Sequence, residues 1–220
     1  GLKIPSALDD RYGFGASIRT EDRPVVFIGP YEHHSNELPW RESIADLVII
    51  DEDADGHVSL EHLERELIRH ADRSTLIGSF SAASNVTGII TDTVAVSTLL
   101  HEHRALSLWD YAAAAPYVPI EMGSSADGNL AYKDAIFISP HKLIGGPGTP
   151  GVLVARRELF TNRVPDVPGG GTVRYVSTAE HDYLPEIEHR EEAGTPAIIE
   201  SIRAGLVFQL KDAVGPAVIE

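Results

Sequence analysis

The sequence DAIFISPHKLIGGPGTPG, residues 134–151, is the most informative stretch of the chain. Its apolar run Ile136–Ile138 predicts a short buried strand, because turn-forming residues follow it closely. The run stops at Ser139, and Lys142 comes just beyond it. In open α/β sheets, ligands bind beyond the carboxyl ends of the strands, so a lysine amine at this position can reach a bound carbonyl. A lone lysine is more often simply exposed, so the interpretation needs a partner elsewhere in the chain.

A second apolar run upstream supplies that partner. Residues 106–109 predict another buried strand, and Asp110 stands at its end, followed by Tyr111 and small residues. Two strands therefore each deliver one ionisable side chain to their ends, a carboxylate and an amine. Pyridoxal phosphate requires such a pair, because the lysine holds its aldehyde as an imine and the carboxylate keeps the pyridine nitrogen protonated.

Length and composition exclude several other classes of protein. With 220 residues, of which 43% are hydrophobic, the chain is long enough for one well-buried globular domain. A net charge of −15 without any cluster of lysine or arginine argues against a nucleic-acid or anionic-membrane partner. The absence of cysteine excludes disulfides and thiolate metal sites. No apolar run approaches the roughly 18 residues of a membrane span and no signal-peptide pattern opens the chain, so the default expectation is a cytoplasmic location.

Apolar runs and helical patterns alternate over most of the chain. Strands are expected at 25–28, 47–50, 76–80, 106–109 and 136–138, and helices at 37–44, 60–70 and 91–103. This alternation predicts an α/β fold with three layers, in which a mostly parallel sheet carries helices on both faces.

The pattern changes after Lys142. Residues 152–155 predict a strand that follows a glycine-rich turn too closely for a helical crossover, so we expect it to be antiparallel to its neighbour. Residues 156–160 predict a short helix. Residues 162–196 form a long polar connection, of a length that is usually functional or part of an interface. A helix at 197–214 closes the chain, with apolar residues at a spacing of four: Ile198, Ile202, Leu206 and Leu210.

The acidic loop after the second strand resembles a calcium loop only in part. Within residues 51–56, aspartates occupy the first, third and fifth positions of an EF-hand loop and a glycine occupies the sixth. The twelfth position, which needs a bidentate glutamate, is His62. A strand rather than a helix precedes the loop. We interpret it as a connection to the next helix, with Ser59 as the helix cap. His101 and His103 are two positions apart and do not share a helix face, so no metal site is predicted.

Six motifs, in this order, carry a resemblance to a known family. They are EHHSNELPW (32–40), SNVTG (84–88), WDYAAAAPY (109–117), SPHKLIGGPGTPG (139–151), GGG (169–171) and EAGTP (192–196). Over residues 24–210, the chain resembles the class V aminotransferase and cysteine desulfurase family of pyridoxal-phosphate enzymes. The resemblance implies an enzyme that uses pyridoxal 5'-phosphate and acts on an amino acid through a lysine Schiff base, as an aminotransferase or a related lyase.

The resemblance also assigns roles around the cofactor ring. Lys142 matches the Schiff-base lysine, and Asp110 matches the partner of the pyridine nitrogen. His33 matches the histidine that stacks on the ring face. Asn85 matches the asparagine that donates a hydrogen bond to the ring hydroxyl oxygen.

Further matches concern the phosphate and the quaternary structure. Ser139 and His141 match the pair that holds the phosphate just before the lysine, where hydroxyl and imidazole donors can meet a dianion. Thr195 resembles a threonine that reaches the phosphate of the other subunit's cofactor. This match implies a homodimer with a shared active site, and residues 169–171 are expected close to the same junction.

The sequence departs from the family pattern in three ways. Ala113 stands where the family often carries a glutamine, the cysteine nucleophile of desulfurases is missing, and the phosphate-binding turn expected before Gly1 is not present. We therefore interpret residues 1–220 as one domain, the core of the large cofactor-binding domain, without the phosphate turn and the small carboxy-terminal domain. An alternative stays open, in which a catalytically incomplete or cofactor-free domain serves dimerisation or partner binding.

Overall fold

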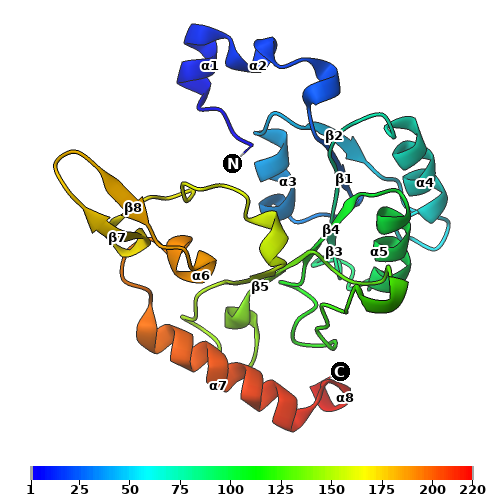
Figure 1. Cartoon of the computed structure of the whole chain (residues 1–220). Helices are drawn as coiled ribbons and strands as arrows, with labels where there is room; N and C mark the ends of the chain where they lie inside the picture. Colours follow the sequence, from blue (N-terminus) through cyan, green and yellow to red (C-terminus); the bar gives the residue numbers. More distant parts are fainter. Residues whose placement is uncertain (1, 220) are drawn as a thin grey trace.

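The structure is a computed structural model that describes residues 2–219 (Figure 1). Its helices are α1 (Ser6–Tyr12), α2 (Phe14–Ser17), α3 (His34–Arg41), α4 (Leu60–Arg69), α5 (Thr93–Glu102), α6 (Ile187–Arg190), α7 (Ile198–Val214) and α8 (Pro216–Ile219). Its strands are β1 (Val25–Ile28), β2 (Asp46–Ile49), β3 (Leu76–Ser81), β4 (Leu106–Asp110), β5 (Ala135–Ile138), β6 (Val152–Ala155), β7 (Val173–Val176) and β8 (His181–Tyr183). Short 3₁₀ segments include η3 (Pro140–Lys142) and η4 (Arg157–Leu159), and η4 lies where a short helix was expected at 156–160.

A six-stranded sheet in the order β2-β1-β3-β4-β5-β6 forms the centre of the molecule. Its strands are parallel except β6, which runs antiparallel to β5. The mostly parallel sheet and the antiparallel strand at 152–155 are therefore both confirmed. The strand order reverses at β1, which has β2 on one side and β3 on the other. Such a reversal opens a crevice beyond the carboxyl ends of the strands, where ligands bind in folds of this kind.

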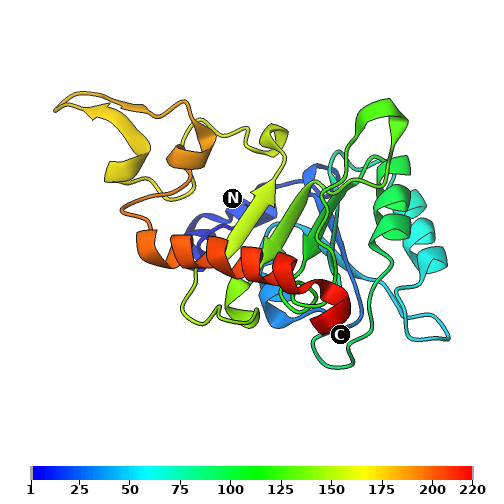
Figure 2. The same cartoon turned by 90° about the horizontal axis from the view of Figure 1, so that it is seen from below.

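Helices cover both faces of this sheet. Alternate residues of β1 point to opposite faces: Val25 and Phe27 join one apolar cluster, and Val26 and Ile28 join the other. The first cluster packs under α4 and α5, whereas the second packs against Trp40 of α3. Figures 1 and 2 show α3 on one side of the sheet and α4 with α5 on the other. The predicted three-layer arrangement is confirmed.

The helix expected at 37–44 begins and ends three residues earlier, as α3. His33 starts it, because its ring Nδ1 accepts a hydrogen bond from the backbone N–H of Ser35 at 3.1 Å. Because the helix begins at residue 34, Pro39 lies inside it and not in its first turn. The sequence did not indicate this start, because histidine is not among the preferred residues at the start of a helix.

Two other helices begin at ordinary caps. The Oγ of Ser59 accepts a hydrogen bond from the N–H of His62 at 3.2 Å, which confirms the predicted cap of α4. Asp92 caps α5 by accepting from Val94 and Ala95, so that this helix starts two residues later than expected.

The last long helix, α7, packs on a face that its sequence pattern did not indicate. Ala204 and Val207 are buried against the rest of the molecule. The apolar residues at a spacing of four point outward instead, with exposed fractions between 42% and 63%: Ile198, Ile202, Leu206 and Leu210. Within residues 2–219, no helix combines the length and the apolarity needed to cross a bilayer.

The segment 162–196 contains regular structure that the sequence did not predict. Strands β7 and β8 form a two-stranded antiparallel sheet, and the short helix α6 follows them. Both views show this hairpin extending away from the six-stranded sheet (Figures 1 and 2).

Candidate functional site

The carboxyl ends of β4 and β5 bring the acid and the lysine turn to one edge of the sheet. Asp110, the last residue of β4, lies opposite Phe137 of β5, and the N–H of Tyr111 donates to the carbonyl of Phe137 at 2.8 Å. Strand β5 ends one residue later. Ser139 and η3, which carries Lys142, therefore follow β5 at the same edge of the sheet as Asp110.

A cavity of about 490 Å³ lies at this edge. It is lined by His33, Ser35, Asn36, Pro39, Trp40, Asp110, Ala112, Phe137, Ile138, Ser139, His141 and Lys142. Five of the seven predicted site residues are thus brought together: His33, Asp110, Ser139, His141 and Lys142. The volume falls within the range of about 300 to 1,000 Å³ that is usual for small-molecule sites.

The remaining two predicted residues, Asn85 and Thr195, line two other cavities. Asn85 lines a second cavity of about 640 Å³, and Lys142 belongs to the lining of both, so the two cavities meet at this lysine. Thr195 is exposed and lines a third cavity with Gly170 and Gly171, apart from the lysine. Residues 169–171 thus lie beside the stretch around Thr195 within the same subunit, since Gly170, Gly171 and Thr195 line one cavity.

Two side chains of the main cavity are held by local hydrogen bonds. The Oδ1 of Asp110 accepts from the N–H of Ala112 at 2.7 Å, which fixes the carboxylate in the turn after β4. The Nδ1 of His33 accepts from Ser35, as described above, and an accepting nitrogen carries no proton. In the neutral ring the proton therefore stands on Nε2, which leaves that atom as the donor.

The glycine-rich loop folds back tightly against the turn that carries the lysine. The N–H of Lys142 donates to the carbonyl of Ser139 at 3.0 Å, and the N–H of Leu143 donates to that of Pro140, also at 3.0 Å. Gly146 passes so close to this turn that a Cβ added to it would stand 1.9 Å from the carbonyl oxygen of Pro140. Only glycine fits at this point, so the loop fixes the backbone beneath the lysine.

Replacing Gly146 with alanine is expected to destabilise the protein by about 1 to 3 kcal/mol, because the added methyl group forces the loop away from η3. Gly151→Ala is a matched control, since its Cβ would meet its nearest atom, the carbonyl oxygen of Ile138, at 3.8 Å. Urea unfolding of both variants measures the difference. Equal midpoints would mean that the loop does not close on the lysine turn.

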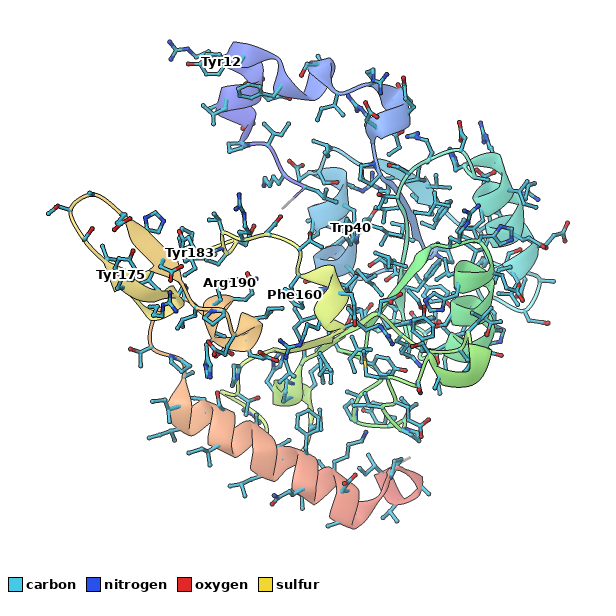
Figure 3. All side chains as sticks on the ribbon, viewed as in Figure 1. Tyr12, Trp40, Phe160, Tyr175, Tyr183 and Arg190 are labelled. Atoms are coloured by element: carbon cyan, nitrogen blue, oxygen red, sulfur yellow. The ribbon has the colours of Figure 1, made fainter. Side chains whose placement is uncertain are left out.

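The sequence did not indicate every residue that lines the cavity, and Asn36 and Trp40 are two that it did not indicate. Asn36 and Trp40 belong to the stretch 32–40, from which only His33 was named. They lie three and seven positions after His33, so they share one face of a helix that begins at residue 34. Figure 3 labels Trp40 on α3. A helix predicted to begin at residue 34 would have placed both residues on the face next to His33.

Comparison with known proteins agrees with this geometry. The profile of the family described as aminotransferase class-V matches residues 12–220. A probable cysteine desulfurase 2 of Mycobacterium leprae is 30% identical over 200 residues, covering 89% of this chain and 44% of that protein. Among the curated relatives, a probable cysteine desulfurase of Streptomyces coelicolor is 27% identical over 201 residues.

Solved structures give the same picture. The apo cysteine desulfurase of Thermococcus onnurineus matches with a TM-score of 0.74 and 26% identity, covering 89% of this chain and 47% of that one. The cysteine desulfurase CsdA of Escherichia coli matches with a TM-score of 0.75 and 25% identity, covering 93% and 49%. The chain thus spans a little under half the length of these relatives. The family resemblance seen in the motifs is confirmed, and the chain belongs to the class-V aminotransferase family.

Proposed function

We propose that this protein binds pyridoxal 5'-phosphate in the cavity at the ends of β4 and β5, as the core of the large domain of an enzyme that acts on an amino acid. The observation that carries the proposal is that Asp110 and Lys142, 32 positions apart in sequence, line the same cavity. The relatives named as cysteine desulfurases support the same class of enzyme. Aminotransferases and related lyases share the first chemical step, so the proposal covers both.

The side chains around the cavity fit this cofactor. Ser139 and His141 offer hydroxyl and imidazole donors to a phosphate. Trp40 and Phe137 offer apolar surface to a flat ring. The carboxylate of Asp110 would accept a hydrogen bond from the protonated nitrogen of the ring.

The cofactor supplies an aldehyde for the lysine amine and a ring that withdraws electrons from the substrate's α-carbon. Asp110 would hold the proton on the ring nitrogen. The Nζ of Lys142, once freed from the aldehyde, would remove the proton from the substrate's α-carbon as a general base. His33 would lie against the ring face, and Asn85 would donate to the ring hydroxyl oxygen.

Thr195 belongs to the proposed quaternary structure. We propose a homodimer in which this residue reaches the phosphate held by the other subunit. Its exposure, and its place in a cavity apart from Lys142, support a role outside its own subunit's site. A site completed by a partner of the same chain requires a two-fold interface.

Borohydride reduction tests the cofactor proposal on the unmodified protein. Pyridoxal phosphate is added, the product is reduced, and the modified peptide is mapped by mass spectrometry. The chain contains four lysines, Lys3, Lys133, Lys142 and Lys211, so the assignment is unambiguous. We expect the label on Lys142. Labelling spread over the other lysines, or no labelling, would contradict the proposal and favour the cofactor-free alternative.

A further inference from the structure

Glu32, the residue before His33, has a side chain that the proposed chemistry does not use. Its Oε1 accepts hydrogen bonds from the N–H of Gly29 at 3.2 Å and from the N–H of Ser81 at 2.9 Å. Its Oε2 accepts from the Oγ of Ser81 at 2.6 Å and from the Nδ2 of Asn36 at 2.7 Å. Burial raises the pKa of the Glu32 carboxyl, while these hydrogen bonds act in the opposite direction.

The four donors come from three different elements. Gly29 follows β1, Ser81 ends β3, and Asn36 lies in the first turn of α3. A Cβ added to Gly29 would stand 2.7 Å from the Oε1 of Glu32, so a side chain at this position would displace the carboxylate. One carboxylate therefore connects the ends of two neighbouring strands to the start of a helix.

Asn36 extends this connection into the sheet. Its side chain is only 8% exposed, and its Oδ1 accepts from the Oγ of Ser79 at 2.7 Å. Its Nδ2 also donates to the carbonyl of Ser79 at 3.3 Å, in addition to its bond with Glu32. Buried polar groups that are satisfied in this way rigidify the elements they join.

His33 lies between the two attachment points of this network. Glu32 holds the chain just before it, and Asn36 holds the helix just after it. Ser81, which donates twice to Glu32, pairs in register with Asp110 on β4. The network thus connects the turn bearing His33 to the strand pair that presents the acidic residue of the cavity.

We propose that Glu32 is a positioning residue, whose carboxylate holds the turn with His33 at the wall of the cavity. The inference rests on the proposed function for the identity of the ligand. Glu32 is not among the residues that line the cavity, so it acts by holding the turn that carries His33 and not by contact with the ligand. Positioning groups of this kind decide whether a binding site is held in its productive geometry.

Glu32→Gln tests the inference, because it keeps the size of the side chain and places an amide NH₂ where Oε2 now accepts from Asn36. Glu66→Gln is the matched control: this carboxylate is 8% exposed and lies on α4, where it pairs with Arg69 at 3.4 Å. The first measurement is hydrogen exchange of the N–H groups of Ser35 and Asn36, which reports local opening without any ligand. We expect about tenfold faster exchange in Glu32→Gln and no change in Glu66→Gln.

The second measurement is a double-mutant cycle on pyridoxal-phosphate affinity with His33→Ala. If Glu32 acts through His33, Glu32→Gln weakens binding about tenfold in the wild-type background and has little effect when His33 is already alanine. Equal losses in both backgrounds would overturn the inference. A merely structural role would give such additive losses, and Glu66→Gln would then resemble Glu32→Gln.

The two measurements separate this inference from the proposed function. A wild-type protein that does not bind pyridoxal phosphate would defeat the proposed function, and hydrogen exchange alone would then decide the role of Glu32. Unchanged protection of Ser35 and Asn36 in Glu32→Gln would overturn the positioning role. Faster exchange confined to this turn would support it.

Discussion

Lys142→Ala is expected to abolish covalent attachment of pyridoxal phosphate and the visible absorbance that accompanies it. Of the four lysines in the chain, this is the one that lines the cavity with Asp110. Any turnover of an amino acid should fall by at least about 10² to 10⁴-fold, the usual contribution of one positioned proton-transfer group. Absorbance titration with the cofactor and mass spectrometry after reduction measure the first effect.

Two control variants show whether the loss of absorbance is due to the missing amine of Lys142. Lys142→Arg keeps a positive charge beside the proposed phosphate site but cannot form the imine, so it should retain reversible binding and lose the absorbance band. Lys3→Ala removes an exposed lysine that does not line the cavity with Asp110, so it should leave the band intact. A band that survives in Lys142→Ala would mean that another amine, or no amine, holds the aldehyde.

Trp109→Ala is expected to give the largest loss of stability, about 3 to 5 kcal/mol. The side chain is fully buried, and its ring centroid lies 6.0 Å from the ring centroid of Phe80. Its indole Nε1 donates to the Oγ of Ser107 at 2.7 Å and to the Oγ of Ser97 at 3.0 Å. The substitution therefore removes a large apolar volume and the donor that satisfies two buried hydroxyl groups.

Trp109→Phe separates these two contributions. Phenylalanine keeps most of the ring contacts but lacks the donor, while Ser97 and Ser107 can still bond to each other across 2.8 Å. We expect a loss between those of the wild type and the alanine variant, measured by guanidinium unfolding followed by circular dichroism. A loss below about 1 kcal/mol for Trp109→Ala would be incompatible with a buried position next to Asp110.

The strands and the acid–lysine pair could be predicted because local patterns determine them. Residues 25–28 are apolar throughout and are bounded by proline and glycine, and β1 has those bounds. Asp110 and Lys142 could be placed at one edge because the carboxyl ends of parallel strands lie together. This reasoning requires only the end of each strand and the direction in which it runs.

Features that depend on contacts between distant segments could not be predicted. The four hydrogen bonds to Glu32 come from residues as far apart as Gly29 and Ser81, and no spacing in the sequence indicates them. The outward face of α7 is a second example. Ile202 and Ile198 suggest a packed stripe, but Ala204 and Val207 are the residues that meet the rest of the molecule.

The order of the strands in the sheet affects how fast the chain can fold, because neighbouring strands are not always neighbours in sequence. Val25 of β1 pairs with Leu76 of β3, so this contact forms only after the long intervening segment has closed into a loop. The β5 and β6 strands are joined by a much shorter connection, and their pairing loses less chain entropy. Refolding from denaturant should therefore be slow, with protection of the β5–β6 pair appearing before that of the β1–β3 pair, because non-local pairing limits the rate.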